Sequence, residues 1–208
     1  MEDVLDVYAE PYDPKRPQVN FDETSKQLIK ETRQSLPAQP GKPQRFDYEY
    51  ERNGTRNLFL FVEPQSGERH VQVTEQRTKV DFAHEMQWLV DICYPAAEVM
   101  RVVLDNLNTH TIASLYEAFE PAAARRIARK LEWHYTPKHG SWLHMAEIAL
   151  SVLQQPCLDR RIPDEDTLKR EIAAWEQQRN AEQAPIDWRF SITDARKKLE
   201  RFYPSLPA

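Results

Sequence analysis

One segment, VMRVVLDN at residues 99–106, limits the possible folds more than any other part of the chain. Apart from Arg101 and the polar residues that end it, the segment is apolar. Such a run is typical of a central β-strand that other layers of the protein cover on both faces. Apolar residues recur at helical spacing before it (78–93) and after it (112–130), which indicates crossovers to parallel neighbours. We therefore predict an α/β fold with three layers, a mixed central sheet with helices on both faces.

Two further strands and a helix are expected near this central strand. Residues 18–24, QVNFDET, are predicted to form a short buried strand that ends in two acids, Asp22 and Glu23. Residues 131–136 are predicted to form another short strand, and residues 142–155 a helix begun by a Gly-Ser pair. Glu23 is expected to point to the face opposite Asp22, as a solvated acid.

Local patterns also predict turns and the course of the amino terminus. The first sixteen residues show little apolar periodicity and are expected to form an extended acidic arm. Aromatic residues alternate with acids over 46–50, which predicts a half-buried strand. Asn53-Gly54 then has the composition of a hairpin turn. We find no internal repeat, so residues 1–208 are expected to form a single domain.

Three acids follow or flank the predicted strands in a way that suggests a metal site. Asp22 and Asp105 each end a strand, and Glu147 lies in the second turn of the helix predicted at 142–155. Ligands bind at the carboxyl ends of the central strands of such sheets. Three carboxylates without cysteine suit Mg²⁺ or Mn²⁺, and a pair of such ions can activate a hydroxyl and stabilise a leaving oxygen. On spacing alone, solvated strand terminators or helix caps remain an alternative.

The ordered set of motifs is more specific than any one of them. The segments QVNFDET, VVLDNLNTH and YTPKHGSWLHMAEI resemble the catalytic domain of mariner-related bacterial insertion-sequence transposases, which are DDE-type enzymes. The matching positions are Asp22, Asp105 with Asn106 and His110, and Glu147. The resemblance implies a ribonuclease H-like fold, two Mg²⁺ or Mn²⁺ ions, and phosphodiester cleavage with strand transfer at transposon ends.

Two departures from the family pattern keep a second function open. The family's asparagine three residues before the last acid is His144 here, which places an imidazole on the same helix face as Glu147. The family also carries a helix-turn-helix region ahead of the first acid, and 21 residues before Asp22 are too few for one. The alternative is therefore a catalytically inactive transposase remnant that binds DNA or a transposase as a regulator.

Basic residues and histidines supply candidate contacts for DNA or for zinc. A track along DNA phosphates is one interpretation of the basic residues, and a solvated helix face is the other. His110 is a candidate for phosphate contact or for support of Asp105, against a histidine that merely begins a helix. A zinc site that uses His144 and Glu147 is a weaker alternative. The basic candidates are Arg125, Arg126, Arg129, Lys130 and Lys138, and the clustered histidines are His110, His134, His139 and His144.

Composition limits the partners. A net charge of −5 argues against nucleic-acid binding through overall charge, although residues 121–146 carry five basic groups and one acid. With four glycines and no Gly-rich phosphate loop, no nucleotide cofactor is expected. No apolar run is long enough to span a membrane, and Cys93 and Cys157 read as reduced thiols, so a cytoplasmic location is expected. The expected partners are DNA and either a second copy, as a homodimer, or a full-length transposase.

Overall fold

The computed structural model describes residues 1–34, 36–45, 47–138 and 140–203. Its centre is a five-stranded sheet in the order β3-β2-β1-β4-β5. Strands β1, β2 and β3 pair antiparallel, whereas β1, β4 and β5 pair parallel, so the predicted mixed sheet is confirmed. The strands are β1 Gln18–Glu31, β2 Tyr50–Glu63, β3 Glu68–Thr74, β4 Met100–Leu104 and β5 Leu131–Tyr135.

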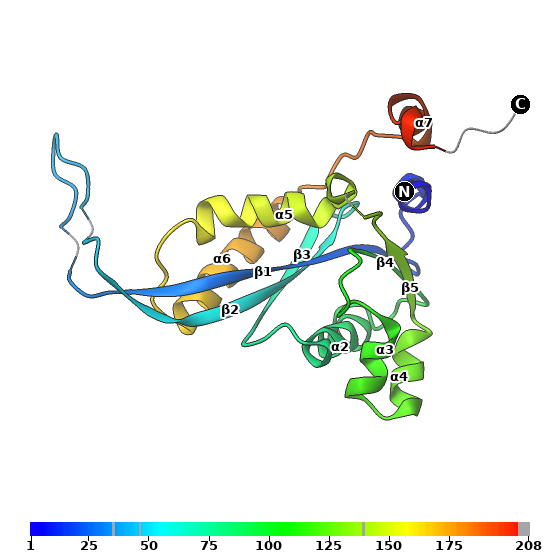
Figure 1. Cartoon of the computed structure of the whole chain (residues 1–208), viewed down its shortest axis with the longest axis horizontal. Coiled ribbons are helices and arrows are strands. Elements are labelled where there is room, and N and C mark those ends of the chain that lie inside the picture. Colours follow the sequence, from blue (N-terminus) through cyan, green and yellow to red (C-terminus); the bar gives the residue numbers. More distant parts are fainter. Residues whose placement is uncertain (35, 46, 139, 204–208) are drawn as a thin grey trace, which may run out of the picture.

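Helices cover both faces of the sheet, as the sequence predicts (Figure 1). One layer contains α2 (Lys79–Trp88), which continues as a π-helical turn (Leu89–Cys93), with α3 (Ile112–Ala118) and α4 (Pro121–Ala128). The other contains α5 (Met145–Leu153) and α6 (Glu165–Glu182). Alternate residues of β2 supply the two cores: Phe59 and Phe61 pack towards α2, and Leu58, Leu60 and Val62 pack towards α5 and α6.

Strand β4 is buried, as its apolar sequence predicts. All five of its residues are buried, including Arg101, which is 1% exposed. The Arg101 guanidinium donates to the Arg16 carbonyl at 3.0 Å and pairs with Glu10, so its buried charge is compensated. Because β4 is held between two layers of helices, the position of the next residue, Asp105, is also fixed.

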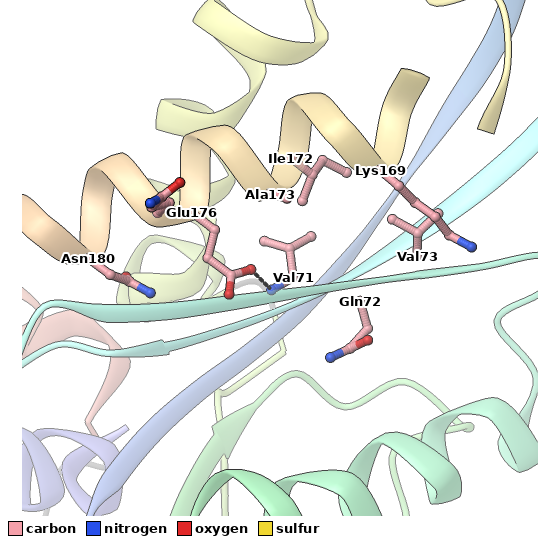
Figure 2. Close-up of a pocket in the computed structure, with 9 residues that line it drawn as sticks. Val71, Gln72, Val73, Lys169, Ile172, Ala173, Glu176 and Asn180 are labelled. Atoms are coloured by element: carbon pink, nitrogen blue, oxygen red, sulfur yellow. Dashed lines mark hydrogen bonds between the residues drawn. The ribbon is translucent and has the colours of Figure 1, made fainter. Parts of the chain in front are cut away.

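Helix α6 also protects the edge of the sheet at β3. Asn180 accepts a hydrogen bond from the Arg69 backbone N–H and donates one to the Arg69 carbonyl, each 2.8 Å long. Glu176 accepts from the Val71 backbone N–H at 3.0 Å, and Figure 2 shows this contact beside a hollow between β3 and α6. These side chains hydrogen-bond to backbone groups of β3 that would otherwise be free to pair with a strand of another chain.

The amino terminus is helical, so the predicted extended arm is wrong. Helix α1 (Glu2–Ala9) buries Val4, Leu5 and Val7. It packs near α7 (Ile192–Lys198), and Arg196 makes a two-pronged salt bridge with Glu2 at 2.8 Å. Docking of this apolar face stabilises a helix too short to form alone.

Strands β1 and β2 are longer than predicted, and their far halves extend beyond the helices (Figure 1). Asn53-Gly54 lies within β2, so the predicted hairpin turn at this pair is wrong. The pair instead forms a bulge, because the pairing shifts between Gln27 and Ile29, and Gly54 supplies the positive φ of 84°. Residues 47–49 are not a strand, contrary to prediction, and Phe46 lies outside the described residues.

Among the described residues, no helix has both the length and the apolar character needed to cross a membrane.

Candidate active site

The sheet brings the first two acids side by side. Strands β1 and β4 run parallel, with Asn20 opposite Val103, and Asp22 and Asp105 each follow two residues later. Asp105 follows the end of β4, as predicted. Asp22 does not end β1, because β1 continues to Glu31 through its pairing with β2. The predicted adjacency therefore holds although one predicted strand end is wrong.

The third acid reaches the same place from α5. A 3₁₀ turn (Ser141–Leu143) precedes the helix, and α5 begins at Met145, so Glu147 lies in its first turn and not in the predicted second turn. Gly140 is required before this turn, because a Cβ there would lie 2.5 Å from Pro137 Cγ. The helix packs against β1 and β2 and points its amino-terminal end at Asp22.

The three predicted acids line one pocket of about 270 Å³, together with Asn106, Lys138 and His144. Asn106 hydrogen-bonds through its side-chain amide to the Thr136 carbonyl and so ties the end of β4 to the residue after β5. A carboxylate pocket at the ends of parallel strands is the arrangement that the sequence predicts.

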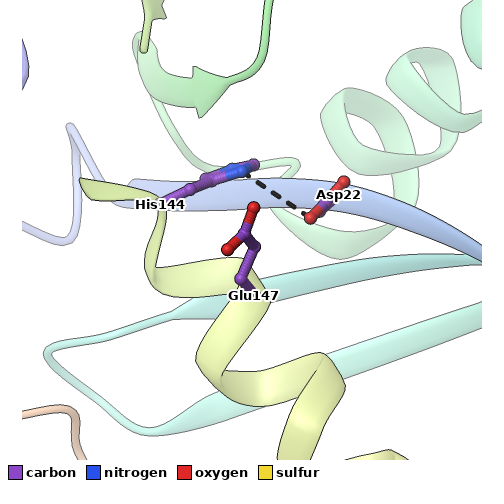
Figure 3. Close-up of side chains that lie close together, drawn as sticks. All are labelled: Asp22, His144 and Glu147. Carbon is purple, nitrogen blue, oxygen red and sulfur yellow. Dashed lines mark ion pairs between the residues drawn. The ribbon is translucent and has the colours of Figure 1, made fainter. Parts of the chain in front are cut away.

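Within this pocket Asp22, His144 and Glu147 form a group with ligand atoms within 4.8 Å of one another (Figure 3). His144 Nδ1 lies 3.7 Å from Asp22 Oδ2. Burial raises the pKa of Asp22 to about 6, and the charge of Asp105 adds to the rise. Burial and the charge of Asp22 also raise the pKa of Glu147. Burial lowers the pKa of His144, so its imidazole is neutral at pH 7.

Asp105 belongs to a second network, which crosses to the other face of β1. His110 Nδ1 lies 2.6 Å from Asp105 Oδ1, and His110 Nε2 lies 2.6 Å from Glu23 Oε2. Burial would lower the pKa of His110, but the hydrogen bonds to Asp105 and Glu23 raise it to about 9. Burial opposes ionisation of Asp105, but the hydrogen bond and charge of His110, together with the hydrogen bond from the Leu107 backbone, lower the Asp105 pKa overall.

This network corrects two predictions. Glu23 does point away from Asp22, but its side chain is 3% exposed and paired, so it is not a solvated acid. His110 is 1% exposed and packs against Phe21 and Phe82, and both ring nitrogens are bonded to carboxylates. Its side chain therefore supports Asp105 and has no free nitrogen for a DNA phosphate.

Comparison with known proteins agrees with this geometry. The family model of the DDE superfamily endonucleases matches residues 17–169, a span that contains all three acids. The chain belongs to this family. The match excludes α1 and α7, and a search of curated proteins finds no significant match.

Solved structures of mariner transposase complexes share the fold of this DDE domain. The Mos1 mariner paired end complex with Mn has a TM-score of 0.54 at 15% identity and covers 87% of this chain and 54% of that chain. The Mos1 strand transfer complex has a TM-score of 0.55 at 14% identity, with coverage of 88% and 55%. The ribonuclease H-like fold is thereby confirmed, and the chain spans about half the length of these Mos1 chains.

The basic residues of this DDE domain are divided between two locations. Lys138 is exposed and lines the pocket. The others belong to α4 or follow it, in the layer opposite α5 (Figure 1). There Arg126 makes a two-pronged salt bridge with Asp91 at 2.6 and 2.7 Å, and Lys130 donates to the Pro95 carbonyl at 3.2 Å. Arg125 and Arg129 are exposed. Of these basic residues, only Lys138 lines the pocket among the residues that the structure describes.

The zinc alternative finds little support around the other histidines. His134 is buried and its Nδ1 lies 3.0 Å from Asp3, while His110 is bonded as described. His139 lies outside the described residues. Cys93 and Cys157 are free thiols and belong to the two different cores.

Glu23 was not predicted as the partner of His110. The sequence around Glu23 indicates a buried role only in that a charged residue lies on a strand that helices cover on both faces.

Proposed function

We propose that this domain binds two divalent metal ions through Asp22, Asp105 and Glu147 and catalyses DNA strand cleavage and strand transfer at transposon ends. One observation carries the proposal: three acids that are far apart in the sequence line a single pocket in a DDE endonuclease fold. Two ions held there would activate an attacking hydroxyl and stabilise the leaving oxygen.

The residues of the pocket fit divalent cations. Its donors are carboxylate oxygens and an imidazole, without cysteine, and the ligand atoms of Asp22, His144 and Glu147 lie within 4.8 Å of one another. His110 holds Asp105 ionised and in place. Lys138 at the pocket wall is placed to bind a phosphate of the DNA backbone.

The proposed partners are DNA and a second transposase subunit. The mariner structures that share this fold are described as a paired end complex and a strand transfer complex. Strand transfer at two transposon ends is expected to need two active sites that act together, so we propose a homodimer or an assembly with a full-length transposase, by analogy of fold.

Calorimetric titration with Mn²⁺ tests the site without knowledge of the DNA substrate. The wild-type domain is expected to show saturable binding that Asp105→Ala abolishes or weakens at least about tenfold, because removal of one carboxylate leaves the ions undercompensated. Asp91→Asn, which breaks a salt bridge in the opposite layer, is the matched control and should bind Mn²⁺ as the wild type does.

A cleavage assay then tests the chemistry. Supercoiled plasmid with Mn²⁺ should be nicked by the wild type and by Asp91→Asn, and at least about 100-fold more slowly by Asp105→Ala, since metal ions contribute several kcal/mol to such reactions. Joined products from duplexes with a free 3′-hydroxyl distinguish a transposase from a simple nuclease. Cleavage that Asp105→Ala leaves unchanged would contradict the proposal, and absence of both metal binding and cleavage would favour an inactive regulator.

A further inference from the structure

His144 lines the pocket beside two of its acids, Asp22 and Glu147. It is 3% exposed and immediately precedes α5. Its Nδ1 faces Asp22 Oδ2 at 3.7 Å, and Glu147 approaches the same point from the first turn of the helix (Figure 3). Its other nitrogen, Nε2, is also buried and has no hydrogen-bond partner among the described residues. The backbone carbonyls of Val103 and Phe21 also lie near the ring, so the nitrogen available to a cation is Nδ1, which faces Asp22.

The spacing of the three side chains fits one ion after a small closure. Ligand atoms that surround one small cation at ~2.1 Å are at most about 4.2 Å apart. The ligand atoms of Asp22, His144 and Glu147 lie within 4.8 Å of one another, so rotamer adjustments of less than an ångström would suffice.

We propose that His144 is itself a metal ligand, so that the ion between Asp22, His144 and Glu147 is a divalent transition metal bound in preference to Mg²⁺. The inference rests on the proposed function, which it refines. Mg²⁺ requires oxygen ligands in near-octahedral geometry, whereas imidazole nitrogen suits the transition metals. The position that contains His144 therefore disfavours Mg²⁺ relative to ions such as Mn²⁺ or Co²⁺.

The other side of the pocket differs in its donors. Asp105 is 36% exposed at its side chain, and its Oδ1 is already held by His110. An ion shared between Asp22 and Asp105 would have only oxygen ligands from these two side chains. The two ion positions are thus chemically unequal: one contains a nitrogen ligand and the other does not. Two classes of binding site are expected in titrations, and only one should discriminate strongly between metals.

Titrations with Co²⁺ and Mg²⁺ test the assignment on the whole domain. The variant His144→Asn replaces the imidazole with an amide, whose oxygen can still bind Mg²⁺. We expect wild-type protein to bind Co²⁺ at least about tenfold more tightly than Mg²⁺ at one site. His144→Asn should weaken Co²⁺ binding at least about tenfold and change Mg²⁺ binding by less than about threefold.

His134→Asn is the matched control, because His134 is also buried but is paired with Asp3 outside the pocket. It should change neither affinity. Circular dichroism and thermal unfolding of each variant establish that the fold is retained. Equal losses for Co²⁺ and Mg²⁺ in His144→Asn would overturn a ligand role and indicate a packing role.

A second measurement needs no variant. Pulsed electron paramagnetic resonance of Mn²⁺ bound to the wild-type domain should show coupling to the nitrogen of an imidazole. Mn²⁺ that is bound without nitrogen coupling, and lost in Asp22→Ala, would overturn the role of His144 while the proposed function stands. Wild-type protein that binds neither Mn²⁺ nor Co²⁺ nor Mg²⁺ would overturn both.

Discussion

Two histidines lie on opposite faces of β1, beside consecutive acids, and they differ in charge although they are almost equally buried. His110 is 1% exposed and pairs with Glu23, and His144 is 3% exposed and faces Asp22. Burial lowers the pKa of both, but two carboxylates at 2.6 Å raise that of His110 to about 9, while that of His144 stays lowered. Partners at hydrogen-bond distance, more than burial, decide whether a histidine here is a cation or a neutral ligand.

This difference in hydrogen bonding indicates that the two sides of the pocket have different roles. The His110 side is fully bonded without metal and holds Asp105 in place. The contacts on the His144 side are longer: His144 Nδ1 lies 3.7 Å from Asp22 Oδ2, and the ligand atoms of Asp22, His144 and Glu147 lie within 4.8 Å of one another. We interpret the first as a rigid support and the second as the part of the site that metal completes.

The largest effect should come from removal of the bonded histidine. His110→Ala leaves the buried Glu23 with only the exposed Arg77, 4.0 Å away, as a counter-charge, which is expected to lower the free energy of unfolding by about 3 kcal/mol. His144→Ala removes no strong partner and should cost about 1–2 kcal/mol in the presence of chelator. Urea unfolding at pH 7 measures both. Equal losses of stability in the two variants would show that the two histidines do not differ in this way. Recovery of stability in the double variant His110→Ala/Glu23→Gln would show that the loss comes from the charge of Glu23.

The pH dependence of stability should also separate the two histidines. The pKa of His110 rises from 6.5 to about 9 on folding, so its contribution is fully present below pH 6.5 and is lost as the pH rises through 9. A shift of this size corresponds to about 3 kcal/mol. The lowered pKa of His144 has the opposite sign: stability falls as the pH drops below 6.5.

Urea unfolding of metal-free protein between pH 5 and 9.5 tests this, with His110→Gln and His144→Asn as the paired variants. The stability difference between wild type and His110→Gln should shrink from pH 6.5 to 9. The difference between wild type and His144→Asn should change only on the acid side. A constant difference for His110→Gln across the range would show that its ring is neutral in the folded protein.

Local sequence pattern predicted the parts of the site that local forces determine. The apolar run of β4 predicted a buried strand, and Asp105 follows it as expected. The ordered motifs placed Asp22, Asp105 and Glu147 in one pocket. The length of β1 was not predictable, because the partner strand β2, and not its own sequence, carries it past Asp22.

Contacts between distant residues account for the rest of what sequence could not predict. Glu23 and His110 are 87 positions apart, and nothing in either segment indicates that they meet. Helix α1 is only eight residues long, and its helical form depends on docking its apolar face against the rest of the chain. Asn53-Gly54 suits a hairpin turn and a bulge equally well, so only the long pairing of β1 with β2 decides between them.

The smallest predicted effect concerns a tyrosine that supports only the His144 side. The Tyr8 hydroxyl lies 2.7 Å from Asn20 Oδ1 and 2.8 Å from the Leu143 carbonyl oxygen. One hydroxyl proton cannot fully serve two acceptors, and Asn20 Nδ2 has no hydrogen-bond partner within the described ranges of the chain. Rotation of the amide lets Nδ2 donate to Tyr8 while Tyr8 donates to Leu143. Tyr8 thereby links β1, two residues before Asp22, to the residue before His144.

Tyr8→Phe removes this link and keeps the ring. It should cost about 1 kcal/mol of stability and weaken Mn²⁺ binding about threefold to tenfold, because the two sides of the metal group are no longer held at a fixed distance. Tyr94→Phe is the matched control: its hydroxyl donates to Glu63 at 3.2 Å outside the pocket, so it should lose similar stability without loss of Mn²⁺ affinity. Equal Mn²⁺ affinities in the two variants would mean that α5 is positioned by its packing on β1 and β2 alone. A selective loss in Tyr8→Phe, with the pH dependence due to His110 unchanged, would show that the amino-terminal helix adjusts one side of the pocket independently of the other.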